Sequence, residues 1–391
     1  MKQKTWIISA LMCAMVIMVC LGVLHLLKEM TENNAPSGTV AEESTDHTEP
    51  EIDFAEEEET KEDIAETGPE EEESDVPVER EEGYYGWKQE LPQIFPSVPE
   101  EVPYEPPRLI LATDLHYQSA QADDGGAAFQ LFVERGDGKV VEYLPELLEA
   151  FMDQVIEEHP SALVLSGDIT MNGEKINHEE LARGLMRVQD AGIPVLIVPG
   201  NHDINNPHAA LYFGEEKAEF YNIYHMYGYD QAISRDDASL SYVYQLDERN
   251  RLLMLDTCQY EPKNMVEGQL KVETLRWADE QLKKAKEDGM NVLFQKYELP
   301  LYLSGHLHVQ RIRKHKAEPG AADDSYGIME IVTDALSIPP CQYALLEWKR
   351  DGSMEYSTKA VDVSAWAART GSQNPDLLDF EGWSERYIQK L

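Results

Sequence analysis

One local arrangement recurs along the chain: a short apolar segment ends in a motif of Gly, Asp, Asn and His. Apolar runs of four to six residues, separated by segments with helical spacing, predict buried parallel strands in a βαβ pattern. The segments and the motifs that follow them are 108–113 with Asp114-Leu115-His116, 162–166 with Gly167-Asp168, 193–198 with Gly200-Asn201-His202-Asp203, and 301–304 with Gly305-His306-Leu307-His308.

The intervening segments complete an α/β prediction. Apolar residues at helical spacing predict helices over 143–158, 178–191 and 271–286. Antiparallel strands are predicted over 239–245 and 251–256, and further strands over 327–332 and 343–356. Because open α/β sheets bind ligands beyond the carboxyl ends of their strands, the four motifs should meet at one edge.

The residue types in these motifs are those that bind divalent metal ions. Carboxylate, imidazole and carboxamide groups form hard-to-borderline metal sites, and a carboxylate can bridge two ions. Two ions about 4 Å apart can clamp a phosphate group and activate a water molecule. The alternative for Asp114 and Asp168 is helix capping after a strand. For His202, His306 and His308 it is a hydrogen-bonded surface histidine.

Taken together and in this order, the four motifs resemble those of the calcineurin-like metallophosphoesterase superfamily, over about residues 104–345. The resemblance implies an α/β/β/α sandwich that binds two divalent ions (Mn, Fe or Zn). It implies that Asp168 bridges the ions, and that His202 lies near the leaving group as general acid or transition-state stabiliser, oriented by Asp203. The other implied ligands are Asp114, His116 and His308 for the first ion, and Asn201 and His306 for the second.

The chain departs from this family at one ligand. The family has a further metal-binding His between the third and fourth motifs, after a strand that should correspond to 291–294. Here Gln295 follows that strand, and residues 295–305 contain no His. Six residues separate 291–294 from the next strand, whereas a parallel crossover needs about a dozen. We therefore expect one strand of the sheet to be lost or re-paired. Candidate substitute ligands are Gln295, His178, His208 and His225.

The N-terminal region predicts a membrane anchor. Residues 6–27 are mostly apolar, with one His and no formal charge, and 22 helical residues would span about 33 Å, enough to cross a bilayer. Lys2 and Lys4 precede this run, which favours a cytoplasmic N-terminus and an extracytoplasmic domain, so the chain is expected at the cell membrane as a single-pass protein. The alternatives are a cleaved signal peptide or a lipoprotein modified at Cys20.

An acidic segment follows the anchor. Residues 42–82 contain 21 acidic and two basic residues, which is a large share of the net charge of −41. Such a segment cannot bury enough apolar surface to fold, so it predicts a disordered linker, with cation collection or partner binding as the alternative. The acidic balance also argues against nucleic acid as a partner. Four cysteines without a Cys-x-x-Cys pair argue against a Cys-based zinc site.

Two Gly-rich segments after the first strand, 123–126 and 134–139, predict an insertion over the site, with a plain surface hairpin as the alternative. The predicted organisation is an anchor over 1–28, a linker over 29–103, a metallophosphoesterase domain over 104–345 and a C-terminal strand and helix over 346–391. The predicted function is hydrolysis of a small phosphomonoester or phosphodiester at the outer face of the membrane. The alternatives are a catalytically impaired binding module and a truncated remnant.

Overall fold

The computed structural model describes residues 79–80, 87–91, 93, 95–122, 126, 133, 136, 138–206, 217–292, 301–316 and 326–390. They belong to one compact unit, Ser74–Leu391. The predicted membrane anchor and residues 29–78 of the predicted linker lie outside the described residues, as do Gln295 and His208. Within the described ranges, no helix is both long and apolar enough to cross a membrane.

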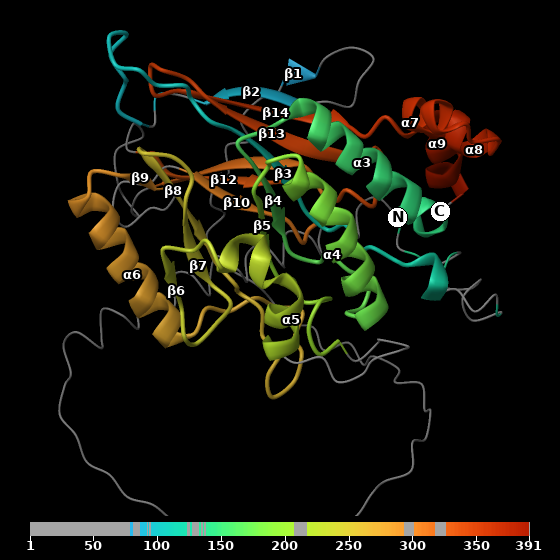
Figure 1. The fold of residues 1–391 in the computed structure, drawn as a ribbon, viewed down its shortest axis with the longest axis horizontal. Helices are drawn as coiled ribbons and strands as arrows, with labels where there is room; N and C mark the ends of the chain where they lie inside the picture. Colours follow the sequence, from blue (N-terminus) through green and yellow to red (C-terminus); the bar gives the residue numbers. More distant parts are fainter. Residues whose placement is uncertain are drawn as a thin grey trace, which may run out of the picture. The chain divides into compact units, whose positions relative to one another are not determined.

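The larger sheet has seven strands in the order β1-β2-β14-β13-β3-β4-β5 (Figure 1). The central strands β3, β4 and β5 are parallel neighbours, as the apolar segments predicted. β13 runs antiparallel to β3 and continues the sheet on its other side. The strands are β1 (Glu79–Arg80), β2 (Trp87–Leu91), β3 (Arg108–Ala112), β4 (Ala162–Ser166), β5 (Val195–Val198), β13 (Gln342–Trp348) and β14 (Met354–Ala360).

Helices α3 (Leu144–Glu158) and α4 (Lys175–Asp190) form the two βαβ crossovers and lie side by side against this sheet (Figure 1). α3 buries Leu144, Leu147, Leu148, Phe151 and Val155, which share one helix face. α4 begins three residues before the predicted start at His178. Two 3₁₀ turns, η1 (Ala120–Ala122) and η2 (Val141–Tyr143), precede α3.

The remaining strands form two smaller sheets, with orders β6-β7-β8-β9 and β10-β12-β11. Helix α6 (Val272–Glu287) covers the four-stranded sheet (Figure 1). α5 (Lys217–Tyr224) and the π-helical turn η3 (His225–Tyr229) precede β6. The strands are β6 (Ser234–Arg235), β7 (Tyr242–Gln245), β8 (Asn250–Met254), β9 (Asn291–Val292), β10 (Leu301–Ser304), β11 (Arg311–Lys316) and β12 (Tyr326–Val332).

β9 and β10 pair with different neighbouring strands. β9 pairs in parallel with β8 over two residues, whereas β10 pairs in parallel with β12 over four. Among the described residues β9 and β10 therefore belong to different sheets. The six-residue connection predicted from the sequence is too short for the right-handed crossover that two adjacent parallel strands require, which accounts for this division.

The smaller sheets pack against the large one. Tyr242 on β7 donates a hydrogen bond to the carbonyl of Ile197 on β5 at 3.1 Å. Tyr356 on β14 donates to Gln310 Oε1 at 2.9 Å. Both tyrosines are buried, so each satisfies its hydroxyl while its ring fills the apolar core between the sheets.

Two predicted domain boundaries do not coincide with edges of the sheet. β2 lies within the predicted linker 29–103, yet it pairs with β14 from Leu91↔Met354 to Lys88↔Ser357. β13 crosses residue 345 and pairs with β3. The C-terminal helices are α7 (Val363–Thr370), α8 (Pro375–Leu378) and α9 (Phe380–Lys390). The sequence of β2 gives little evidence of a strand, because alternating charged residues are also typical of a linker.

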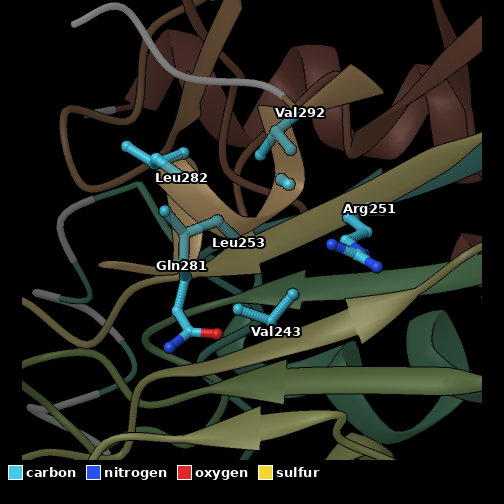
Figure 2. A pocket seen from close by; sticks show the side chains of 7 residues that line it. Val243, Arg251, Leu253, Gln281, Leu282 and Val292 are labelled. Atoms are coloured by element: carbon cyan, nitrogen blue, oxygen red, sulfur yellow. The ribbon is translucent and has the colours of Figure 1, made fainter. Parts of the chain in front are cut away.

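A small pocket lies between α6 and the β7-β8-β9 edge (Figure 2). Its lining is mostly aliphatic, and its one cation, Arg251, is paired with Asp288 at 2.8 Å. The lining contains no histidine, cysteine or carboxylate side chain, so it offers no catalytic or metal-binding group. The residues are Val243, Arg251, Leu253, Gln281, Leu282, Ala285 and Val292.

Candidate metal centre

The ends of β3 and β4 bring two motifs together at one edge of the large sheet. The Asp114 N–H donates to the carbonyl of Gly167 at 3.1 Å, and the His116 N–H donates to the carbonyl of Asp168 at 2.9 Å. These bonds continue the parallel strand pairing beyond the strands. The side chains of Asp114, His116 and Asp168 are all buried there.

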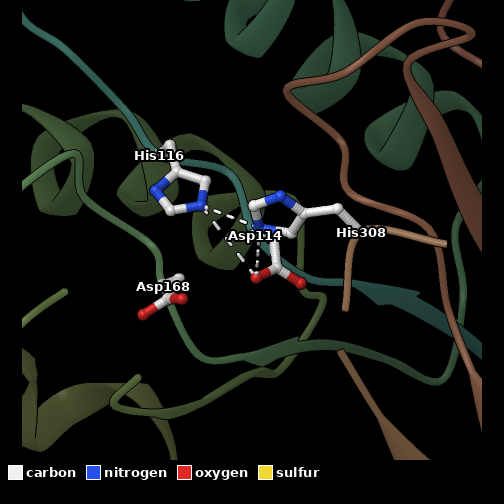
Figure 3. Close-up of side chains that lie close together, drawn as sticks. All are labelled: Asp114, His116, Asp168 and His308. Carbon is white, nitrogen blue, oxygen red and sulfur yellow. Dashed lines mark hydrogen bonds and ion pairs between the residues drawn. The ribbon is translucent and has the colours of Figure 1, made fainter. Parts of the chain in front are cut away.

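Four of the predicted ligands converge (Figure 3). Asp114, His116, Asp168 and His308 each offer one ligand atom, and these four atoms lie within 4.8 Å of one another. His308 Nε2 lies 3.1 Å from Asp114 Oδ1 and 3.2 Å from His116 Nε2. His116 Nε2 lies 4.0 Å from Asp114 Oδ1.

This arrangement fits a divalent ion. Ligand atoms about 2.1 Å from one ion lie about 3 to 3.5 Å apart in tetrahedral or octahedral geometry. Of the three separations between the two ring nitrogens and the carboxylate oxygen, two lie in this range, at 3.1 and 3.2 Å, and the third is 4.0 Å. His116 Nδ1, on the far side of its ring, is buried and has no hydrogen-bond partner among the described residues, so Nε2 is the atom aimed at the cluster. Asp114, His116 and His308, together with Asp168, therefore fit the first divalent ion that the resemblance implies.

The backbone at this edge adopts a conformation that most side chains avoid. Left-handed φ angles cost free energy for residues other than Gly, and they cluster at functional sites. Five of the predicted ligands have them, which turns each side chain sharply from the end of its strand. The φ angles are 53° for Asp114, 44° for His116, 46° for Asp168, 72° for His306 and 50° for His308.

Two glycines leave room for the carboxylates. A Cβ built on Gly200 would overlap the amide nitrogen and Oδ1 of Asp168. A Cβ on Gly305 would overlap Thr113 Oγ1 and, at 2.5 Å, Asp114 Oδ2. The third and fourth motifs therefore need their first glycine because the backbone passes directly against the two buried aspartates.

Asp203 has a different role from the one the sequence predicted. Its buried carboxylate accepts hydrogen bonds from the N–H groups of Gly200 at 2.7 Å and Ile169 at 3.2 Å, and from Thr170. Among the described residues these donors, and not the His202 ring, surround the carboxylate. Asp203 therefore joins the Asp168 loop to the His202 loop and does not orient the His202 imidazole directly.

His202 is oriented by a backbone carbonyl. Its Nδ1 lies 2.6 Å from the carbonyl oxygen of Met171, which only accepts, so Nδ1 carries the proton. The His202 N–H donates to Asp168 Oδ1 at 2.7 Å. The His202 ring meets the His116 ring edge-on, with centroids 4.6 Å apart. His202 Nε2 is thus the nitrogen available to exchange a proton with a bound molecule.

Burial and local charge shift the pKa values at the site in opposite directions. Burial lowers the pKa of His116 well below its ordinary value. Burial also raises the pKa of Asp203 to about 7, and the charge of Asp168 adds to this. For Asp168 burial also acts to raise the pKa, but the interactions with His306 and with the neighbouring His116 and His202 outweigh it and lower the pKa. This lowered pKa favours the ionised carboxylate.

The second-ion residues are less closely gathered. His306 Nδ1 lies 3.9 Å from Asp168 Oδ2, beyond hydrogen-bond distance, and the interaction with this carboxylate raises the pKa of His306. Asn201 lies in the same loop as His202, and its carbonyl accepts from Asn264 Nδ2 at 2.7 Å. Among the described residues, one group of Asp, Glu, His or Cys side chains converges as potential metal ligands, and it is that of the first site.

Two candidate substitutes for the missing histidine lie elsewhere. His178 is fully buried, with Nε2 2.9 Å from the Asp203 carbonyl and Nδ1 3.0 Å from the Tyr224 hydroxyl. His225 forms an exposed pair with Asp230 at 2.6 Å. Both nitrogens of His178 and Nδ1 of His225 have other partners, and neither residue belongs to a convergent ligand group among the described residues.

Sequence reasoning missed the residues that support the ligands. Ser337 Oγ donates to the carbonyl of Asp114 at 2.7 Å, and Thr113 Oγ1 donates to Asp114 Oδ2 at 2.8 Å. Asn264 Nδ2 also donates to the carbonyl of Ile204 at 2.8 Å and so fastens the loop that carries Asn201. Single Ser, Thr and Asn residues outside the motifs give no sequence signal, so these supports could not be found without the fold.

Residues 107–310 match the family described as calcineurin-like phosphoesterase. The chain belongs to this family. Its members are metal-dependent phosphoester hydrolases, which agrees with the convergent Asp and His side chains at the strand ends. The mixed α/β fold agrees with the family as well. No curated protein sequence matches the chain.

Matches among solved structures include a dimetal phosphatase from Danio rerio, at 14% identity and a TM-score of 0.44, covering 62% of this chain and 93% of that one. A predicted phosphoesterase from Streptococcus pneumoniae has 16% identity, a TM-score of 0.26 and coverage of 65% and 99%. A 5'-nucleotidase precursor from Thermus thermophilus has 14% identity, a TM-score of 0.35 and coverage of 66% and 54%. None of these likenesses assigns a substrate to the chain.

We predict that Gly200→Ala abolishes metal binding, because the added methyl group must displace the Asp168 carboxylate. The measurement is bound metal per chain after dialysis, with circular dichroism to check folding. Gly289→Ala is the control: Gly289 has a positive φ but no atom within 4 Å of its built Cβ, so only about 1 kcal/mol of stability should be lost. Unchanged metal content in Gly200→Ala would contradict the role given to Asp168.

Proposed function

We propose that the chain hydrolyses a phosphate ester, with Asp114, His116, Asp168 and His308 holding a first divalent ion. In this proposal Asp168, Asn201 and His306 hold a second ion, and His202 assists departure of the leaving group. The observation that carries the proposal is the convergence of four ligand atoms within 4.8 Å at the carboxyl edge of a parallel sheet. The substrate class is a small phosphomonoester or phosphodiester.

Two divalent ions, when bound, would supply Lewis-acid polarisation of a phosphoryl oxygen and activation of a water molecule. The protein's own groups set the geometry. The buried Asp168 carboxylate is held by the His202 N–H at 2.7 Å, so the proposed bridging ligand and the proposed acid move as one unit. The His202 Nδ1 proton is committed to the Met171 carbonyl, which leaves Nε2, when protonated, to donate to the departing oxygen.

A second candidate function is a metal-binding module with impaired turnover. The observation that favours it is the division between β9 and β10, together with the absence of a His in the sequence between them. The second ion then keeps three protein ligands from the implied set, and a site that loses a ligand binds its ion less tightly. Turnover by a two-ion mechanism would be reduced accordingly.

In this proposal the domain lies outside the cytoplasmic membrane. Its support is the uncharged run over 6–27 with Lys2 and Lys4 before it. The acidic segment over residues 42–82 would hold the domain at a distance from an anionic membrane surface, because like charges repel. Cleavage of a signal peptide would instead release the domain.

We predict that Asp168→Asn removes hydrolysis of a generic aryl phosphate and most of the bound metal. The amide cannot supply the negative charge that two nearby cations require. The measurements are initial rate and metal content per chain. The matched control is Asp230→Asn, at an exposed carboxylate paired with His225, which should leave both unchanged. A variant at position 168 that kept both metal and activity would overturn the proposal.

We predict that calorimetric titration with Mn²⁺ gives two steps whose affinities differ by about tenfold or more. The first site has four protein ligands and the second has three. Even the loss of a residue that only hydrogen-bonds a metal ligand lowers metal affinity or activity about 10- to 100-fold. Hydrolysis should therefore fall early under mild chelation. Two equally tight steps would mean that another residue replaces the missing His. A single step with no hydrolysis would favour the binding module.

We predict that protease added to intact cells releases the folded domain by cutting within the acidic segment. The cell-bound anchor should remain, and a cytoplasmic marker protein should stay intact as the control. Release of the domain into the medium without protease would favour a cleaved signal peptide. Protection until the cells are lysed would show that the orientation is inverted.

A further inference from the structure

We propose that Asn264 is a positioning residue for the second divalent ion, and that it acts through the backbone of Asn201. This inference rests on the proposed function and names a residue that supports its second ion. Asn264 belongs to the loop 257–269, which lies between β8 and α6 and outside the four metal-binding motifs. Asn201 follows β5, and in the proposed function it is a ligand of the second ion and not of the first.

The side-chain amide of Asn264 holds the backbone on both sides of His202. Its Nδ2 donates to the carbonyl of Asn201 at 2.7 Å and to the carbonyl of Ile204 at 2.8 Å. Carbonyl oxygens only accept, so the atom that faces them is the amide nitrogen, and both of its N–H groups are used. One side chain therefore bridges the two ends of the segment 201–204, which contains the proposed acid.

The loop 257–269 and the residues after β5 are joined in both directions. Asn205 Nδ2 donates back to the carbonyl of Tyr260 at 2.8 Å. Cys258 Sγ, a weak donor, lies 3.3 Å from the carbonyl of Pro199. These contacts lie on either side of the two bonds from Asn264. The loop therefore holds the whole segment 199–205 and not a single point in it.

The loop 257–269 is closed by its own backbone. The Met265 N–H donates to the carbonyl of Gln259 at 2.8 Å, next to Asn264 in the chain. The Gln269 N–H donates to the carbonyl of Thr257 at 2.6 Å, near the base of the loop. A backbone fixed in this way has already lost its conformational freedom, so the Asn264 amide is in place before an ion binds.

The bonds from Asn264 bear on the second ion site more than on the first. The first-ion ligands follow β3, β4 and β10, and the Asp114 carbonyl has its own support from Ser337 Oγ at 2.7 Å. Of the proposed ligands, Asn201 is the one that lies on the segment held by the loop. The second site has three protein ligands, because residues 295–305 contain no His. With so few ligands, affinity depends strongly on each being positioned in advance.

The test titrates Mn²⁺ calorimetrically into the full chain and into Asn264→Leu, which keeps the size of the side chain and removes both donors. The expected result is that the second step weakens by about tenfold or more, whereas the first changes by less than about threefold. The matched control is Asn291→Leu. Asn291 Nδ2 donates to Asn250 Oδ1 at 3.0 Å, at the end of β8 opposite the loop 257–269, so this variant should leave both steps unchanged.

A spectroscopic measurement separates positioning from stability. Two Mn²⁺ ions that share a carboxylate ligand are magnetically coupled, and electron paramagnetic resonance distinguishes such a pair from single ions. At a Mn²⁺ concentration that just fills both sites of the unaltered protein, the pair signal should be much weaker in Asn264→Leu and unchanged in Asn291→Leu. A merely structural role for Asn264 would instead lower the unfolding temperature and weaken both calorimetric steps alike.

The possible outcomes distinguish the role of Asn264 from the proposed hydrolysis. Equal weakening of both steps, or no weakening in Asn264→Leu, would overturn the role of Asn264 even if aryl phosphates are hydrolysed. A single step in the unaltered protein would overturn it too. If Asn264→Leu does not fold, Asn264→Ala is judged by the same results, and failure of both to fold would show a structural role and overturn the inference. Selective loss of the second step without hydrolysis by the unaltered protein would leave Asn264 in its role and remove the proposed hydrolysis alone.

Discussion

The candidate metal centre depends on one buried carboxylate that is not expected to touch a metal. Asp203 accepts hydrogen bonds from the backbone of Gly200, Ile169 and Thr170, and so joins the loops that follow β4 and β5. These loops carry different motifs, and the carboxylate bonds to the backbone of both. With Asp203 between them, Asp168 and His202 keep a fixed relation, and the His202 N–H reaches Asp168 Oδ1 at 2.7 Å.

The sequence predicted the parallel centre of the sheet and the residues at its carboxyl edge, because apolar strands and metal-competent side chains have local patterns. It did not predict that Asp203 would bond to backbone groups, since an Asp next to a His is equally able to orient the ring. It also missed β2, whose pairing with β14 joins residues more than 260 positions apart. Pairing over such distances is determined by packing, and leaves little trace in a short charged segment.

The charge of the centre argues for cations in it. Asp114, Asp168 and Asp203 are all buried. Burial is the main cause that raises the pKa of Asp203 to about 7, and the charge of Asp168 adds to it. Burying like charges near one another is costly unless positive charge or hydrogen bonds offset them. Asp203 obtains hydrogen bonds from backbone groups. Asp114 and Asp168 each accept a hydrogen bond as well, and they also face imidazole nitrogens of His308 at 3.1 Å and of His306 at 3.9 Å.

The short sequence between β9 and β10 bears unequally on the two proposed ion sites. β10 is held in register by β12, from Leu301↔Met329 to Ser304↔Val332, and the Thr333 N–H continues this pairing with the Ser304 carbonyl at 2.8 Å. The segment after β12 then bonds to the end of β3, where the Leu336 N–H donates to the carbonyl of Thr113 at 3.0 Å. The position of His308 opposite Asp114 is therefore supported from the β12 side and does not require β9. The short connection offers no His to the proposed second site, while the strand that leads to His308 keeps its own support.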